Sequence, residues 1–250
     1  MSIIDTVQQR LMMKKLIKEY GASAQIIKGA DGSIFIPSDA PEVPEWKIDG
    51  KSDFDKFIKR YGMSAVDENG KTIPYTMASR GSVEASKNVT MIVPEYKLFG
   101  RRWTMVQEEA RPIDVARRGK EARQLAFPAG IIGDEAAFAN ESAMQSAVRE
   151  LSEETGLVAK KVEKLTPKVP IMTSPGLTDE STHFFKAFIS SLKPSQKAVT
   201  DGGVTRGWHF VPVKKLPKWF ESMEKLGKIP SGQTLTAIAL NILKHSKIPL

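Results

Sequence analysis

The feature that most constrains this chain is a run between residues 140 and 157 that combines helical periodicity with clustered acidic side chains. Asn140 or Ser142 can cap the start of a helix, and Gly156 favours a helix exit. The apolar residues recur at helical spacing, so they would form one stripe that packs on a core: Met144, Ala147, Val148 and Leu151. We therefore predict an amphipathic helix over 140–155.

Three glutamates fall on the face beside this stripe, because residues at i, i+3 and i+4 are neighbours on a helix: Glu150, Glu153 and Glu154. These carboxylates repel one another, and negative charge is unfavourable near a helix C-terminus. A hard divalent cation such as Mg²⁺, which takes oxygen ligands, would remove the conflict. Arg149 can pair with Glu153 and reach back toward Glu141. The alternative is a solvated acidic helix end, which the spacing disfavours.

The spacing of these residues resembles the Nudix hydrolase signature, Gly-x5-Glu-x7-Arg-Glu-U-x-Glu-Glu-x-Gly-U, in which U is aliphatic. From Glu141 to Leu157 every specified position of the signature is matched. The opening glycine is not, because Glu135 stands at its place, and the best counterpart is Gly130, with five extra residues within 131–140. Length changes are tolerated in such loops, so the insertion would alter access to the site and leave the glutamates in place.

The resemblance implies an α+β fold, an α/β/α sandwich with a mixed β-sheet, and hydrolysis of a diphosphate linked to a nucleoside or another group. By motif position the metal ligands would be Glu150, Glu153, Glu154 and the backbone carbonyl of Ala129. Glu153 and Glu154 would also act in catalysis, with Arg149 and Glu141 as orienting residues. The expected cofactor is Mg²⁺, for which Mn²⁺ could substitute. Bound Mg²⁺ would neutralise the diphosphate oxygens and activate water.

Three further segments are similar to the ADP-ribose and nucleotide-sugar pyrophosphatase branch of this superfamily: Phe-Pro-Ala-Gly at 127–130, Glu-Glu-Ala-Arg-Pro at 108–112, and Ser-Pro-Gly-Leu-Thr-Asp-Glu at 174–180. The branch implies that Arg111 lies near a phosphate or the terminal ribose. It also implies that the 174–180 loop, with Pro175, Gly176 and Glu180, shapes the substrate pocket. A surface salt bridge at Arg111 and an ordinary turn at Pro175-Gly176 are the alternatives.

The catalytic base is left open by the sequence. The branch usually places a catalytic glutamate in the loop before the strand at 208–211, but residues 199–207 contain no glutamate. Asp201 is the carboxylate in that loop, although an aspartate beside two glycines more often caps a turn. Glu153 and Glu180 are the other candidates.

Along the chain, the resemblance covers about 74–245, so we expect a hydrolase domain at 74–250 and an extension or small subdomain at 1–73. Within the extension we predict helices over 3–19 and 52–58, with irregular chain at 29–50. In the domain we predict strands over 89–94, 103–107, 125–130, 169–172, 183–189 and 208–211, with a C-terminal helix over 233–243. Strands mixed with helices, without regular βαβ alternation, favour a layered α+β domain.

Composition narrows the chemistry and the partners. The chain has no cysteine, which excludes disulfides, cysteine-bound zinc and thiol nucleophiles, and its three histidines are far apart. The net charge of +8 favours anionic partners. A lysine cluster at Lys214, Lys215 and Lys218 beside Trp219 keeps nucleic acid open as a partner, and Trp103 and Trp208 are candidates for base stacking or core packing. No secretory core or membrane-spanning window is present, so we expect a cytoplasmic protein.

We therefore expect Mg²⁺-dependent hydrolysis of the diphosphate linkage in a nucleoside diphosphate derivative. ADP-ribose or a nucleotide sugar is the first expected substrate. Another diphosphate, such as a dinucleotide, a coenzyme or a capped RNA end, is the first alternative. The second alternative is a non-catalytic module that binds nucleotide or RNA, which the retained glutamates disfavour. In the resembling branch N-terminal strands often build part of a dimer, so we also expect a homodimer.

Overall fold

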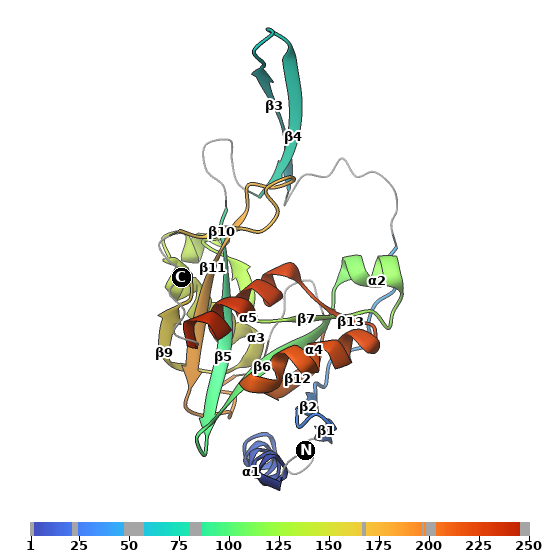
Figure 1. The fold of residues 1–250 in the computed structure, drawn as a ribbon, viewed down its shortest axis with the longest axis vertical. Helices are drawn as coiled ribbons and strands as arrows, with labels where there is room; N and C mark the ends of the chain where they lie inside the picture. The colour runs from blue at the N-terminus through green and yellow to red at the C-terminus, as the bar shows by residue number, and fades with distance from the viewer. Residues whose placement is uncertain are drawn as a thin grey trace.

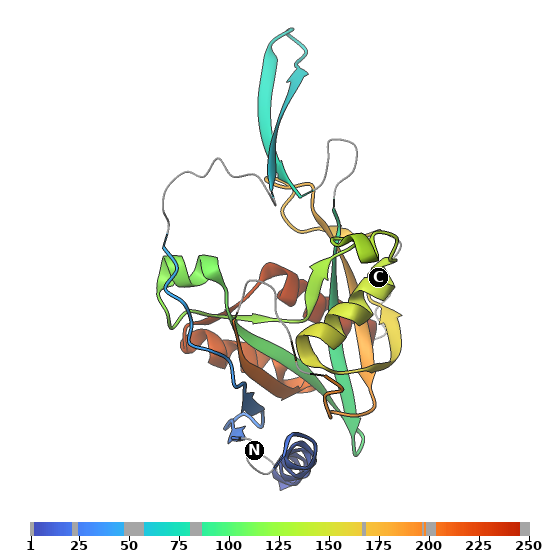
Figure 2. The ribbon, with the colours of Figure 1, turned by 180° about the vertical axis from the view of Figure 1, so that it is seen from behind.

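The computed structural model describes residues 3–21, 25–47, 58–80, 87–166, 169–196, 198 and 204–245. A mixed β-sheet forms the middle layer, with α3 (Ala143–Thr155) on one face and α4 (Leu216–Lys225) and α5 (Gly232–His245) on the other (Figures 1 and 2). This arrangement confirms the expected α/β/α sandwich.

The remaining helices lie at the edges of these layers: α1 (Ile3–Tyr20), α2 (Pro112–Arg118) and the 3-10 turns η1 (Ala136–Phe138) and η2 (Val213–Lys215). The strands, in chain order, are β1 (Ile27–Lys28), β2 (Ile34–Pro37), β3 (Lys59–Val66), β4 (Thr72–Ser79), β5 (Val89–Leu98), β6 (Arg101–Ala110), β7 (Arg123–Ala126), β8 (Ala129–Ile131), β9 (Ala159–Lys164), β10 (Ile171–Met172), β11 (Ser181–Ile189), β12 (Val204–Pro212) and β13 (Lys228–Pro230).

Across the described part of the chain, the main sheet has eleven strands, seven of them in the order β1-β2-β12-β6-β5-β11-β10, and the other members branch from β6, β5 and β11. The strands β7 and β13 extend from β6, β8 pairs with β5, and β9 pairs with β11. The pairs β5–β11 and β7–β13 are parallel, and the others are antiparallel. The strand predicted over 125–130 is divided in two at Phe127-Pro128.

Alternation along the central strands sends side chains to two separate cores. On β5, Ile92 packs with Leu151 of α3, whereas Met91 and Val93 pack with Trp219 of α4. Since successive strand residues face opposite sides of a sheet, each face receives its own helices. Helix α1 adds Met12 and Leu16 to the core beneath α3, which accounts for part of the apolar spacing in residues 3–19. Ile4, Val7 and Ile17 of the same helix are exposed.

Part of the N-terminal extension joins the main sheet. The prediction of irregular chain over 29–50 is wrong at β2, which pairs with β12 between Ile34–Phe210 and Pro37–Gly207. The side chains of Ile34 and Ile36 are buried in the core, and this burial stabilises a short strand that local composition does not predict. The division of the chain at residue 73 stays a prediction.

The hairpin of β3 and β4 projects away from the sheet layers (Figure 1). Its pairing places the apolar side chains of both strands on one face: Tyr61, Met63, Ala65, Ile73, Tyr75 and Met77. The hairpin is tied to the body where Tyr75 donates a hydrogen bond to the Gly176 carbonyl. The helix predicted over 52–58 lies almost wholly outside the described residues. No described helix is long and apolar enough to cross a membrane.

Candidate active site

Helix α3 begins and ends as its sequence predicts. The Ser142 side chain accepts a hydrogen bond from the Gln145 amide, and the Gln145 side chain accepts one from the Ser142 amide, which forms a capping box. At the other end Gly156 has a φ of 69°, a left-handed conformation that favours glycine. The helix therefore holds its acidic C-terminal half in a fixed orientation against β5 and β8.

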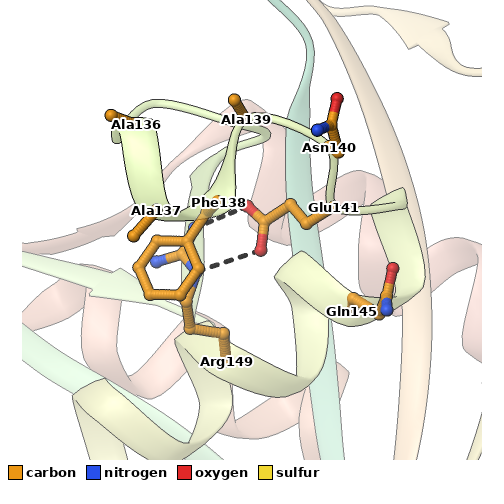
Figure 3. A pocket seen from close by; sticks show the side chains of 8 residues that line it. All are labelled: Ala136, Ala137, Phe138, Ala139, Asn140, Glu141, Gln145 and Arg149. Atoms are coloured by element: carbon orange, nitrogen blue, oxygen red, sulfur yellow. Dashed lines mark hydrogen bonds and ion pairs between the residues drawn. The ribbon is translucent and has the colours of Figure 1, made fainter.

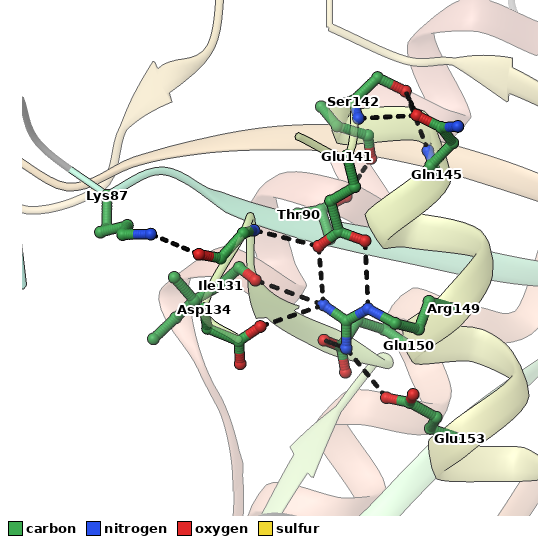
Figure 4. Close-up of polar contacts among 12 residues, drawn as sticks. Lys87, Thr90, Ile131, Asp134, Glu141, Ser142, Gln145, Arg149, Glu150 and Glu153 are labelled. Atoms are coloured by element: carbon green, nitrogen blue, oxygen red, sulfur yellow. Dashed lines mark hydrogen bonds and ion pairs between the residues drawn. The ribbon is translucent and has the colours of Figure 1, made fainter. Parts of the chain in front are cut away.

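Arg149 is the centre of the polar network on this helix (Figure 4). Its guanidinium donates to both carboxylate oxygens of Glu141, at 2.9 and 3.1 Å, and to Glu153 at 2.9 Å. The same group lies 2.7 Å from a carboxylate oxygen of Glu150. These contacts lower the pKa of Glu141, mainly through the Arg149 hydrogen bond, and they raise the pKa of Arg149. Arg149 thus fixes the carboxylates that flank it.

The inserted residues 131–140 supply the other contacts to Arg149. The Ile131 carbonyl and Asp134 each lie 3.4 Å from its guanidinium. The ring of Phe138 covers the same group, with 4.6 Å between the guanidinium carbon and the ring centroid (Figure 3). Glu141 also accepts a hydrogen bond from the Gly133 amide. The insertion therefore supports the orienting arginine as well as changing the loop length.

A pocket of about 600 Å³ brings most of the predicted site residues together. Its walls include all three box glutamates and several residues from elsewhere in the chain: Glu150, Glu153, Glu154, Arg149, Ala129, Arg111 and Glu180. Such a volume suits a ligand of nucleotide size. Glu141 lies outside this pocket and acts on it through Arg149.

Two glutamates of this pocket, Glu150 and Glu154, are buried. Burial raises the pKa of Glu150 to about 7, and repulsion from Glu153 and Asp134 adds to this shift. Burial also raises the pKa of Glu154 well above its usual range, with further repulsion from Glu109 and Glu150. The Ala129 amide donates a hydrogen bond to Glu154 and opposes the shift in part. A pocket of this kind favours a cation.

Glu109 is a site residue that the sequence reasoning did not assign. It lies on β6, its side chain is buried, and burial raises its pKa. Its carboxylate accepts a hydrogen bond from Arg111 at 2.7 Å, so Arg111 stands at the pocket with a partner already in place. The signal was available in the quoted segment 108–112, where a glutamate two residues before Arg111 points to the same face of the strand.

Gly130 is the counterpart expected for the signature's opening glycine, and the structure gives a reason for it. A Cβ at this position would stand 1.9 Å from a carboxylate oxygen of Glu150. The carboxylate of Glu150 therefore packs against bare backbone. Any other residue at this position would push Glu150 out of its place.

The donor set at this pocket fits a divalent cation. Seven carboxylates and three arginines line it, and those contributed by α3 and by the segment 109–111 are Glu109, Glu150, Glu153, Glu154, Arg111 and Arg149. Oxygen ligands of this kind are those that Mg²⁺ prefers. Within the described ranges no three acidic or histidine side chains stand close enough together to hold a metal ion. Arg149 contacts Glu150 at 2.7 Å and Glu153 at 2.9 Å. A bound cation would compete with Arg149 for these oxygens.

Not every residue singled out in the sequence lines this pocket. Pro175 and Gly176 do not line the pocket, and the 174–180 loop reaches it through Glu180 alone. Glu180 is held by Arg80, whose Nε lies 3.0 Å from its carboxylate. Asp201, the candidate base in the 199–207 loop, lies outside the described residues. Of the two tryptophans predicted as candidates for stacking or core packing, Trp103 is buried in the core and Trp208 packs against the same core in a partly buried position.

Comparison with known proteins gives a family match and several similar folds. The model of the NUDIX domain matches residues 101–228. A crystal structure of an ADP compounds hydrolase has a TM-score of 0.52 and 16% sequence identity, and the match covers 90% of this chain and 99% of that one. A comparison with curated proteins found no match.

Two further solved structures are less similar. The NUDIX domain of Shewanella oneidensis NrtR, in complex with ADP ribose, has a TM-score of 0.43 and 13% identity over 64% of this chain and 89% of that one. A NUDIX hydrolase from Nitrosomonas europaea has a TM-score of 0.43 and 21% identity over 63% and 89% of the two chains.

Proposed function

The chain belongs to the NUDIX domain family, and we propose that it is a Mg²⁺-dependent pyrophosphohydrolase of a nucleoside diphosphate derivative, with ADP-ribose or a nucleotide sugar as the first substrates to test. The observation that carries this proposal is the pocket at the end of α3, where buried carboxylates and Arg111 line one space. The fold is shared with an enzyme described as an ADP compounds hydrolase, which is consistent with the substrate class.

We propose Glu150, Glu153, Glu154 and the Ala129 carbonyl as the groups that hold the cation. When bound, Mg²⁺ supplies neutralisation of the diphosphate oxygens and a water of lowered pKa. Mn²⁺ has the same charge and accepts oxygen ligands, so it is a reasonable substitute.

The side chains of this chain supply orientation and charge. Arg149 holds the glutamates in register, so it acts as a positioning residue through Glu141 and Glu153. Arg111 presents its guanidinium to the same pocket and would neutralise phosphate oxygens of the substrate. Glu153 and Glu180 are each held by an arginine, and as the base we favour Glu153, because its side chain is 40% exposed to water and that of Glu180 is 19% exposed.

The proposal is tested with purified protein, ADP-ribose and either Mg²⁺ or EDTA, with products resolved by ion-exchange chromatography. Addition of water across the diphosphate yields two phosphate monoesters, AMP and ribose 5-phosphate, and we expect both in equal amounts when Mg²⁺ is present. An ADP-sugar, a dinucleotide and a capped RNA form the comparison set. If none of these substrates is cleaved with Mg²⁺ or Mn²⁺, the chain is a binding module and the proposal fails.

We also propose that the chain forms a homodimer. The apolar face of the β3–β4 hairpin is largely exposed, with Met63 at 44%, Ile73 at 49% and Tyr75 at 46%. An exposed apolar face of this kind favours association. Light scattering after size exclusion would give twice the chain mass of 27.6 kDa, and Ile73→Lys would shift the protein toward monomer. A wild-type mass equal to one chain would contradict this proposal.

A further inference from the structure

A second pocket, of about 500 Å³, lies at the turn between β5 and β6, with walls from α1 and η2. We call it the hairpin pocket. Its lining residues in the described structure include four basic side chains and one acidic one: Arg101, Arg102, Lys214, Lys215 and Asp5. The far end of β6 carries Glu109 of the active site, about 26 Å away at the usual rise of a strand. The hairpin pocket is thus separate from the active site.

The charge in the hairpin pocket is only partly balanced. Asp5 accepts a hydrogen bond from Arg101 at 2.8 Å and lies 3.2 Å from the Lys215 amine. These two contacts fix the basic groups on one side of the pocket. Lys214 on η2 is exposed, and Arg102 makes a longer contact of 3.4 Å with Glu95. A positive surface therefore remains open to an anion, as the net charge of the chain favours.

An exposed aromatic ring stands at the edge of this positive surface. Phe99 is 70% exposed and occupies the turn with a φ of 45°, followed by Gly100 with a φ of 78°. Both values are positive, as in a type I′ hairpin turn, where asparagine is the favoured first residue and a bulky residue is strained. Phe99 therefore costs the fold stability and adds no core packing. Strain of this kind is a mark of functional positions.

We propose that the hairpin pocket binds a nucleotide group, with the base stacked on Phe99 and the phosphate held by Lys214 and Arg102. Every base has a face that stacks on an aromatic ring, and lysine and arginine are the usual partners of phosphate. The group comes either from a free nucleotide or from a single-stranded nucleic acid, because both present the same base and phosphate. This site does not depend on the proposed hydrolase activity.

The test measures fluorescence anisotropy of a labelled single-stranded oligonucleotide bound to the full chain in EDTA, over a series of salt concentrations. Phe99→Asn should weaken binding about fivefold or more, as expected for the loss of one stacked base. It should leave the thermal unfolding temperature unchanged or higher, because asparagine suits the turn. Lys214→Gln should reduce the slope of log K against log salt by about 0.7, the effect of one phosphate contact on a single strand.

Two matched variants serve as controls that should bind as the wild type does. Lys218→Gln removes an exposed positive charge on α4 that does not line the hairpin pocket, and Arg111→Gln alters the active site. If AMP displaces the labelled oligonucleotide, the ligand of the site is a free nucleotide. If the oligonucleotide binds and AMP does not displace it, the ligand is nucleic acid. Three results would each overturn the proposal. They are no binding at low salt, binding by both Phe99→Asn and Lys214→Gln that equals that of the wild type, and full competition by inorganic phosphate.

Discussion

Arg149 donates hydrogen bonds to both carboxylate oxygens of Glu141, at 2.9 and 3.1 Å, across eight positions of the chain. Glu141 precedes the helix and Arg149 lies in its middle, so this pair joins the inserted loop to the acidic end of α3. The same guanidinium contacts Glu150 and Glu153. The orientation of the acidic face therefore depends on one side chain.

Replacing Arg149 by lysine should reduce the rate of hydrolysis with little effect on the fold. A lysine keeps the positive charge and loses the planar fork that contacts Glu141 at two points. We expect kcat to fall about 10- to 100-fold, as for the loss of a charge-assisted hydrogen bond, and KM to change less. Steady-state kinetics measures both constants. Arg118→Lys, at a surface pair 3.6 Å from Asp114, is the matched control and should retain full activity. Equal losses in the two variants would contradict a positioning role.

Gly130→Ala should disturb the metal site through Glu150. The added methyl group would overlap a carboxylate oxygen of Glu150, so this side chain must move. We expect a higher Mg²⁺ concentration for half-maximal activity, with an unfolding temperature close to that of the wild type. The control is Gly62→Ala on β3, where the added carbon meets nothing within 4 Å. An unchanged Mg²⁺ requirement in Gly130→Ala would remove Glu150 from the set of ligands.

Glu150 should make the metal-free protein less stable as the pH rises. Its pKa is raised from 4.5 to about 7 in the folded state, mainly by burial. Between pH 4.5 and pH 7 the folded protein therefore binds more protons than the unfolded chain. Stability therefore falls as the pH rises through this window. In EDTA, Glu150→Gln should be more stable than the wild type at pH 8, by on the order of 1 to 3 kcal/mol, and the difference should shrink toward pH 5.

Mg²⁺ supplies the control for this prediction, since a cation that binds the folded state stabilises it. At pH 8 the added metal should raise the unfolding temperature of the wild type more than that of Glu150→Gln. Equal denaturant midpoints for the two proteins at every pH would show that Glu150 is ionised in the folded protein without cost.

Asp5 should contribute stability that is lost in acid. Hydrogen bonds from Arg101 and Lys215 lower its pKa from 3.8 to about 2. Its contribution is present above the unfolded pKa and is lost as the pH falls through this window. Asp5→Asn should be less stable at pH 7 by about 1 kcal/mol or less, because the pair is reached by water. Urea unfolding at pH 7 and pH 2 checks this, with the exposed Asp39→Asn as control. A difference that persists at pH 2 would rule out the ionic cause.

The sequence was sufficient to predict what depends on local spacing. The box glutamates and Arg149 lie within one helix, so the period of 3.6 residues per turn determines which of them are neighbours. The cap at Ser142 and the exit at Gly156 follow from the same local rules. Helices α1 and α5 were also predicted from apolar periodicity. Helix α5 packs one face on a core, whereas α1 buries Met12 and Leu16 and leaves Ile4, Val7 and Ile17 exposed.

What the sequence could not predict depends on contacts between distant segments. Glu109 on β6 lies near enough to raise the pKa of Glu154 on α3 only because the fold brings these two segments together, and no local pattern records that distance. Strand β2 forms because β12 offers it an edge, although the composition around it indicates a loop. Phe99 was not singled out either, since its exposure and its positive φ are properties of the folded turn.

The central claim is that the carboxylates of α3 hold a cation that drives diphosphate hydrolysis. It is tested most directly by the rate of AMP formation from ADP-ribose at saturating Mg²⁺ in the wild type, Glu154→Gln and Glu121→Gln. Glu121 is 94% exposed and lies outside the pocket, so its variant should match the wild type. We predict that Glu154→Gln loses activity by at least about 100-fold, a cost of about 2.7 kcal/mol in transition-state stabilisation. Equal rates in all three proteins would contradict the account.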